Sequence, residues 1–575
     1  MSLGNWFHDS SSVKIALKIL LIIACLGVIH HREFAEHIRN VQDFYVFNDD
    51  VRQYIPPFYR YQDDGPSSED YITNYYLQAV SPIGFRALYQ WAAQYWDPRA
   101  VSKVLPYLLW ASLLVTLGIT SWKLGGATTC FATLALTLLS AVFFDRMAGG
   151  LPRSFGFPLL ALALSAVVFG RIYWTGIMTV LGAAFYPLVT VISGMTMALV
   201  LLVLPSKYRG EAVAWSYKKS FAVLLLTAGL SAATALPQLQ NGASYGRRVL
   251  ASDVENFPEA GLGGRYDPGD APPFDHVGTE VIRTVLSQYG VSVFGLRPGE
   301  VPAKASVQVL SAIGLLALLI MILKGFKKQA PEAVTFRLLM MVLATGIAHA
   351  VALILLPYLY IPSRYVTYTA PLFLVIIVPV GLYGMVASLR PLKEKASLLT
   401  VTLVALFVIV FAGHRGVGYT VRVASHRPLY SFIATLPPDS VIAGWPLGIM
   451  DNVPYLGRRN AFLTYETHQV LHMGYMQEMR KRMTALIDAY LGQDIQPLLD
   501  LNKRFGVDYL LVDKRHFVKG SPLNPPWYFA PFREQILSLV VQTQGNAFVM
   551  SNRVDPAAIF WGGDILLLDL RLLEQ

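Results

Sequence analysis

Long apolar runs separated by short charged turns dominate this chain. A membrane-spanning helix needs about twenty mostly apolar residues. Such runs predict spans over 13–30, 103–121, 127–144, 155–170, 176–190, 191–205, 220–237, 306–323, 335–356, 366–388 and 396–413. The stretch 176–205 is expected to break into two short helices or a re-entrant pair, with Pro187 and Gly194 as the break points. The pattern therefore predicts a polytopic α-helical membrane protein with about eleven transmembrane helices.

Basic residues between the runs orient these spans. Lys14 and Lys18 lie at the start of the first run, and no small-residue cleavage pattern follows it, so it is expected to be a retained span with a cytoplasmic N-terminus. Later cytoplasmic turns are marked by Lys123, Arg171, Lys207, Arg209, Lys218, Lys219, Lys324, Lys327, Lys328, Arg390, Lys393 and Lys395. The alternation puts the C-terminus outside the cytoplasm.

Two external segments fall within the expected transmembrane domain, residues 1–413. Residues 31–102 are polar and aromatic, and the helical periodicity over 75–96 predicts helices that lie along the membrane interface. Residues 238–305 are rich in Gly, Pro and Asp, which predicts a long loop with little regular structure.

Residues 414–575 have the pattern of a small soluble domain outside the cytoplasm. Short apolar runs predict strands at 441–443, 509–512 and 548–550, and a helix is expected over about 475–491. The alternation of strands and helices predicts a C-terminal α/β domain.

Composition supports a membrane protein and excludes other classes. The 575 residues are 54% hydrophobic and only 15% charged, with a mean hydropathy of +0.45. The net charge of +10 comes from basic residues in the turns, so no nucleic acid is expected as a partner. Cys25 and Cys130 both lie in apolar runs, so neither a disulfide framework nor a cysteine metal site is expected.

Asn48-Asp49-Asp50 follows the first span and is the main candidate for chemistry. Adjacent residues cannot both point into one groove, so one acid is expected to act on substrate while the other orients it or helps to hold a metal. An aspartate has a reference pKa of about 3.9 and is a weak base for a free alcohol. It is effective when the proton leaves as the new bond forms, which suits glycosyl transfer with its oxocarbenium-like transition state. The alternative is a helix N-cap or a surface turn.

Arginines in external turns are candidates for binding phosphate. Arg364, in Ser363-Arg364-Tyr365, precedes a late span, and its planar guanidinium matches phosphate oxygens. The alternative is an arginine that anchors a helix end at the membrane surface. Arg146 and Arg153, near Gly149-Gly150, are weaker candidates for the same role.

Other polar groups are expected to be structural. Asp63-Asp64 and Glu69-Asp70 flank a Gly-Pro-Ser-Ser stretch that is typical of a solvated turn. His349 lies in an apolar span and is expected to be a hydrogen-bonded packing residue. His468 and His472 have the i, i+4 spacing of a metal face on a helix, but no third ligand accompanies them, so ordinary surface or interface histidines are favoured.

With the acid pair, the span pattern and the Ser-Arg-Tyr turn in place, the chain resembles the GT-C glycosyltransferases. The resemblance implies an inverting enzyme that takes a sugar from a polyprenyl-phosphate-linked donor. It implies that Asp49 and Asp50 are the first-loop acids and that Arg364 contacts the donor phosphate. No WWDYG-type signature is present, which disfavours protein N-glycosylation. A divalent cation (Mg or Mn), held by Asp49 or Asp50, is left open.

The sequence therefore predicts sugar transfer in cell-envelope glycan biosynthesis, to a lipid, glycan or protein acceptor on the extracytoplasmic side. The alternatives are a polysaccharide polymerase or ligase, and a transporter or flippase for lipid-linked sugars. Transporters usually bind their substrate near the bilayer midplane and often have internal repeats, and neither feature is visible here. The absence of an Asn-X-Ser/Thr acceptor favours a bacterial inner membrane as the location.

Overall fold

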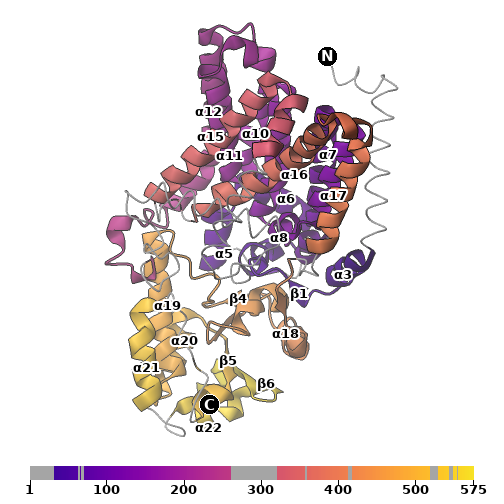
Figure 1. Cartoon of the computed structure of the whole chain (residues 1–575). Helices are drawn as coiled ribbons and strands as arrows, with labels where there is room; N and C mark the ends of the chain where they lie inside the picture. Colours follow the sequence, from indigo (N-terminus) through magenta and orange to yellow (C-terminus); the bar gives the residue numbers. More distant parts are fainter. Residues whose placement is uncertain are drawn as a thin grey trace.

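The computed structural model describes residues 31–62, 65–66, 70–260, 320–355, 359, 361–411, 418–518, 523, 529–542, 548–552 and 554–574. The predicted span 13–30 and most of the predicted span 306–323 lie outside these residues. Figure 1 shows a large helical part, and next to it a smaller domain that contains the main sheet.

Five helical segments of the described residues are long and apolar enough to cross a membrane. They are α7 (Pro98–Leu139), the segment Pro152–Phe169 that ends with α9 (Gly156–Phe169), α12 (Tyr217–Ala243), α15 (Glu332–Ile354) and α16 (Ser363–Ala387). Shorter apolar helices are α10 (Ile172–Phe185), α11 (Pro187–Leu202) and α17 (Ala396–Phe411). The protein is thus mostly helical with apolar spans, while the total of about eleven spans stays a prediction.

Helix α7 is broken where the sequence predicts a turn between two spans. Gly125 and Gly126 have non-helical backbone angles, and Gly126 has a φ of +75°, which only glycine adopts readily. The second part ends at Leu139, earlier than the predicted residue 144. Another helix, α8 (Ala141–Met147), follows Ser140.

Helices α10 and α11 confirm the predicted pair of short helices within 176–205. The break lies at Pro187, which opens α11 and cannot continue α10 because proline lacks the N–H. The prediction of a second break point at Gly194 is wrong, because Gly194 lies inside α11. A Cβ there would lie 3.2 Å from Thr179 Cγ2, so Gly194 allows close packing of α11 on α10.

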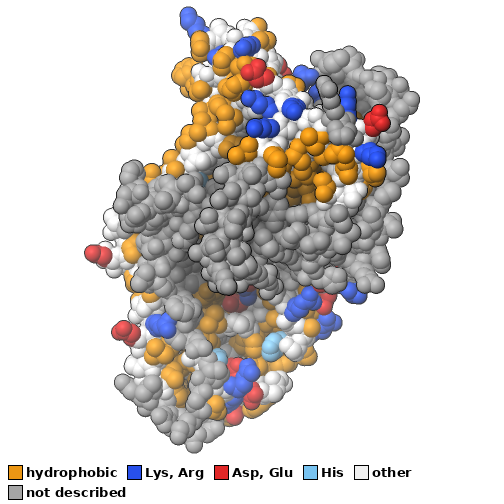
Figure 2. Space-filling view, viewed as in Figure 1, with side chains coloured by type: hydrophobic (Ala, Val, Ile, Leu, Met, Phe, Trp, Pro, Cys, Tyr) orange, Lys and Arg blue, Asp and Glu red, His pale blue; other side chains and the backbone are white. Residues whose placement is uncertain are grey.

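Helix α12 forms an outer face of the helical part. Between Phe221 and Leu239 its large exposed side chains are apolar: Phe221, Leu225, Leu226, Leu230, Leu236 and Leu239. Figure 2 shows hydrophobic side chains covering this region, whereas charged side chains are mixed over the smaller domain. Such a large exposed apolar surface is expected where a protein faces lipid. Because α12 continues to Ala243, the predicted loop 238–305 begins later than expected. Residues 261–305 of this loop lie outside the described residues.

The first external segment contains several short elements. They are α3 (His31–Gln42), β1 (Val46–Phe47), α4 (Val51–Tyr54), α5 (Tyr71–Tyr75), a π-helical turn (Tyr76–Val80) and α6 (Ile83–Ala93). The predicted helices over 75–96 are therefore present. Their position along the membrane interface stays a prediction.

The C-terminal domain is an α/β unit, as predicted. Its helices are α18 (Arg427–Ile433), α19 (Met473–Tyr490), α20 (Gln496–Phe505), α21 (Arg533–Gln542) and α22 (Val549–Asn552). Its strands are β3 (Val441–Gly444), β4 (Asn460–Ala461), β5 (Tyr509–Asp513), β6 (Ala558–Gly562) and β7 (Ile565–Asp569). The strand order is β4-β3-β5-β7-β6. Strand β3 is parallel to β4 and β5, and β7 is antiparallel to β5 and β6.

One strand prediction in this domain is wrong. Phe548 directly precedes helix α22, which begins at Val549, so residues 548–550 do not form a strand. The run is only three apolar residues long, and periodicity cannot separate a strand from a buried helical turn at that length. The buried ring of Phe548 packs on Phe517.

The first external segment is held directly against the C-terminal domain. Strand β1 pairs with β2 (Val421–Arg422) in a two-stranded antiparallel sheet. The Tyr59 hydroxyl donates a hydrogen bond to the Tyr455 carbonyl at 2.6 Å. Because these contacts join residues almost four hundred positions apart, any site in the first segment can include side chains of the C-terminal domain.

Candidate active site

Asp49 and Asp50 lie in the turn that leads into α4. The turn is anchored by Asn48, whose amide donates to the Gly418 carbonyl at 2.9 Å. Asp50 is at the N-cap position of α4 but makes no side-chain capping bond. The Asp49 side chain is 52% exposed and that of Asp50 is 27% exposed. The capping role considered from the sequence is therefore not what Asp50 does here.

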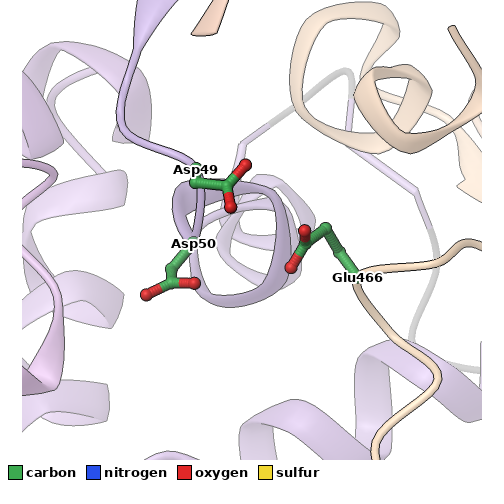
Figure 3. Close-up of side chains that lie close together, drawn as sticks. All are labelled: Asp49, Asp50 and Glu466. Atoms are coloured by element: carbon green, nitrogen blue, oxygen red, sulfur yellow. The ribbon is translucent and has the colours of Figure 1, made fainter. Parts of the chain in front are cut away.

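A third carboxylate, Glu466, reaches this turn from the C-terminal domain (Figure 3). It lies in the connection between β4 and α19 and is buried. Asp49, Asp50 and Glu466 each offer one oxygen, and the three oxygens lie within 4.8 Å of one another. The sequence analysis missed Glu466 because no spacing or motif connects it to the acid pair.

Arg52 connects the acids of the two parts of the chain. Its Nη2 donates to Glu466 Oε1 at 2.9 Å and also pairs with Asp49. Its Nη1 lies 3.8 Å from Asp451 Oδ2 and donates to Asn452 Oδ1 at 3.4 Å. One buried guanidinium thus interacts with three carboxylates, two of which come from the C-terminal domain.

Asp451 is fully enclosed within this network. Its Oδ1 accepts a hydrogen bond from the backbone N–H of Glu466 at 3.1 Å. Burial raises the pKa of Asp451 to about 7, although Arg52 nearby acts in the opposite direction. The carboxyl is therefore close to the midpoint of its titration at neutral pH.

Arg153 binds the other side of the acid turn. It forms an ion pair with Asp50, and its Nη2 donates to Asn48 Oδ1 at 2.8 Å. Gly149, close by, has a φ of +92°, and a Cβ there would lie 2.8 Å from Val51 Cγ1. The glycine thus lets this backbone approach the acid turn.

Arg146 was given the same phosphate role as Arg153. The structure places it in the last turn of helix α8, and its side chain is half-buried. Of these two arginines, Arg153 is the one with a contact to the acid turn among the described residues. A phosphate-binding role for Arg146 stays a prediction.

Arg364 lies at the start of α16 and lines a cavity of about 200 Å³. The cavity also contains Arg248, which the sequence analysis did not single out, together with Tyr54, Tyr186 and Gln238. Pro152 lines the same cavity, and the next residue, Arg153, interacts electrostatically with both Arg364 and Asp49. Asp49 and Asp50 do not line the cavity, but Arg153, which pairs with Asp50, directly follows the lining residue Pro152.

The oxygen set at the acid turn has the chemistry of a divalent-cation site. Magnesium and manganese prefer carboxylate oxygens, and Asp49, Asp50 and Glu466 supply three that converge. Arg52 and Arg153 already pair with these oxygens, so a bound cation would share them with the two guanidinium groups.

The remaining polar residues are structural where the structure describes them. His349 Nδ1 lies 2.9 Å from the Pro362 carbonyl, which confirms a hydrogen-bonded packing role. His468 and His472 precede α19 and are buried, so they are neither a helical pair nor surface residues. Asp70 caps α5 by accepting from the Thr73 N–H at 2.7 Å. Asp63, Asp64 and Glu69 lie outside the described residues.

Comparisons with known proteins find similarity in structure only. The sequence matches no family model and no curated protein. Solved structures of the oligosaccharyltransferase from Archaeoglobus fulgidus are similar. The one tethered to an acceptor peptide with the NVT sequon has a TM-score of 0.48 and 12% identity, covering 94% of this chain and 72% of that chain.

Two further structures of that archaeal enzyme give similar values. The complex with Zn and sulfate has a TM-score of 0.46 and 12% identity, covering 88% of this chain and 68% of the other. AglB with an inhibitory peptide and a dolichol-phosphate has a TM-score of 0.46 and 11% identity, covering 89% and 70%. These neighbours are GT-C enzymes, the class that the sequence resembles. TM-scores below 0.5 carry no function from them to this chain.

Proposed function

We propose that this protein is a membrane glycosyltransferase. It moves a sugar from a polyprenyl-phosphate-linked donor to an acceptor hydroxyl on the extracytoplasmic side, with inversion at the anomeric carbon. The observation that supports this most directly is the arrangement of charges around Arg153. This residue pairs with the first-loop acid Asp50 and lies beside the cavity that contains Arg364 and Arg248.

The donor phosphate would bind in the cavity of about 200 Å³, between Arg364 and Arg248. Two guanidinium groups supply several N–H donors and positive charge for a phosphate leaving group. Tyr54, Tyr186 and Gln238 add hydroxyl and amide groups to the same wall. This placement sets the sugar beside Arg153, on the side of the acid turn.

Asp49 is the proposed base, because it has the most exposed carboxylate of the three. In the reaction, the acceptor oxygen forms a bond to the anomeric carbon while the bond from that carbon to the phosphate oxygen breaks. The acceptor proton passes to Asp49, and the leaving phosphate keeps the bonding electron pair. Asp50 positions Arg153, and Glu466 positions Arg52.

A divalent cation fits this proposal as a cofactor. Asp49, Asp50 and Glu466 would hold it, and a bound cation would supply positive charge to the phosphate as the bond breaks. We also propose the topology inferred from the basic turns: a cytoplasmic N-terminus, an extracytoplasmic C-terminal domain (414–575) and a bacterial inner membrane.

The test is turnover by the full chain in lipid nanodiscs. The probe is undecaprenyl phosphate carrying a radiolabelled glucose, with a membrane glycolipid extract as acceptor. Loss of a general base lowers rates by about 10²–10⁴-fold, so Asp49→Asn should lower turnover by at least about a hundredfold. The matched control is Asp43→Asn in the same external segment, where the amide oxygen can still accept from the Tyr45 N–H.

Two results would contradict the proposal. One is an Asp49→Asn variant with near wild-type turnover. The other is movement of the labelled lipid across the membrane without any transfer in the wild-type protein, which would favour a flippase.

A further inference from the structure

A second cavity lies in the C-terminal domain, away from the proposed phosphate site. Its volume is about 310 Å³, within the range of small-molecule sites. It opens where strands β3 and β5 end: Trp445 follows β3, and Asp513 is the last residue of β5. Crevices at the carboxyl ends of adjacent parallel strands are a common position for ligand sites in α/β folds.

Aromatic rings and hydrogen-bonding groups share the wall of this cavity. The rings of Trp445 and Tyr490 lie 5.7 Å apart. The Tyr490 hydroxyl is 2.9 Å from His516 Nδ1 and accepts from the Asp513 N–H at 3.2 Å. These contacts fix the ring of Tyr490 and orient the imidazole of His516.

The charged groups of the cavity neutralise one another. Arg515 donates to both carboxylate oxygens of Asp513, with distances of 2.9 and 2.6 Å. Burial lowers the pKa of His516, so its imidazole is neutral at pH 7. Asp513, Arg515 and His516 together therefore have no net charge to attract a phosphate or a cation.

We propose that this cavity binds a neutral carbohydrate. The apolar C–H face of a sugar ring packs against aromatic side chains, and its hydroxyls both donate and accept hydrogen bonds. Trp445 supplies the ring, and His516, Asp513 and Arg515 supply the polar partners. Tyr490 is fully buried and holds His516 through its hydroxyl. The site would let the C-terminal domain hold a glycan independently of the transfer reaction.

The cavity is also connected to the acid turn by one short loop. Gly448, Ile449 and Met450 line the cavity, and the next residue, Asp451, lies in the Arg52 network. Asn452 donates to the Gly448 carbonyl at 2.9 Å and accepts from Arg52. A carbohydrate in the cavity would thus lie against a segment that also shapes the proposed active site.

The test is saturation-transfer NMR on the full chain in nanodiscs, which avoids maltoside detergents. The probes are the methyl glycosides of mannose, glucose and galactose, with methyl glucuronide as the charged comparison. Saturation should reach the ring C–H protons of at least one neutral glycoside. Its signal should fall at least fivefold in Trp445→Ala and in His516→Ala. The matched control is Trp561→Ala, which removes an exposed tryptophan of the same domain and should leave the signal unchanged.

His516→Ala tests the site even if Trp445→Ala fails to fold, because it removes only a partly exposed side chain. The proposal is overturned if no neutral glycoside gives a signal or if methyl glucuronide binds more tightly than all of them. A signal that survives in a folded His516→Ala variant overturns it too. Binding and turnover are measured separately, so failure here leaves the transferase proposal intact.

Discussion

The buried acid Asp451 makes the stability of the C-terminal domain depend on pH, and Asp451→Asn should remove much of this dependence. The pKa of Asp451 is raised from 3.8 to about 7 in the folded protein, mainly by burial. The folded state therefore binds a proton that the unfolded chain has already released between about pH 4 and pH 7. By linkage, this contribution to stability is complete below about pH 4 and is lost as the pH rises through 7.

The size of the effect follows from the shift of roughly three pH units. At about 1.4 kcal/mol per unit, the total is about 4 kcal/mol. Integrating the titration between pH 5 and pH 8 gives a loss of about 2.5 kcal/mol over that interval. For a domain of this size, that corresponds to a fall in Tm of about 5–10 °C. Asparagine has no proton to lose, and its oxygen can still accept from the Glu466 N–H.

The assay is thermal unfolding of the nanodisc-bound protein at pH 5 and pH 8, followed by tryptophan fluorescence. The difference in Tm between the two pH values should be about 5–10 °C smaller in Asp451→Asn than in the wild type. The matched control is Asp564→Asn, in the exposed turn between β6 and β7, which should keep the wild-type difference. Parallel pH profiles for Asp451→Asn and the wild type would refute the assignment of a raised pKa to this residue.

Two further changes test contacts between the parts of the chain. Arg480→Met leaves the fully buried Glu259 without the guanidinium that donates to it at 2.5 and 2.6 Å, so thermal unfolding should show a loss of about 3–5 kcal/mol. The control variant is Arg504→Met on the exposed face of α20, which should change the free energy of unfolding by less than about 1 kcal/mol. An equal loss of stability in Arg480→Met and Arg504→Met would contradict this reasoning. Gly149→Ala forces an alanine into a φ of +92° against Val51, which costs about 1–2 kcal/mol. If this strain shifts the acid turn, turnover should fall by roughly tenfold. Unchanged turnover would mean that the acid turn tolerates the shift.

Among the described residues, the predicted spans coincide with apolar helices because their signal is local. A span is visible as a run of apolar residues, and Pro187 marks a break that the structure also has. The break in α7 at Gly125-Gly126 falls between two predicted spans. The failures occur where local pattern is ambiguous. Gly194 can break a helix or allow two helices to pack closely, and the surrounding residues do not separate these roles. The run 548–550 is too short to have a period.

The candidate site is predicted only in part, because its members come from distant regions. Asp49, Asp50 and Arg364 stand out through type and position next to spans. Glu466 and Arg248 have no such signal, since each is an ordinary charged residue until the fold brings it to the site. The local sequence therefore indicates site residues that lie next to the ends of predicted spans. It does not indicate residues that reach the site from distant parts of the sequence.

The Arg52 network shows why the two domains expected from the sequence act as one unit at this site. The expected boundary between residues 413 and 414 separates Arg52 from Glu466 and Asp451, yet these side chains share one buried cluster of charges. Removing one partner of a buried ion pair usually destabilises a protein by about 3–5 kcal/mol, because the other charge is left without compensation. Docking of the C-terminal domain and the position of Asp49 are therefore coupled through Arg52. A shift of the domain that moves Glu466 would also move the guanidinium that pairs with Asp49.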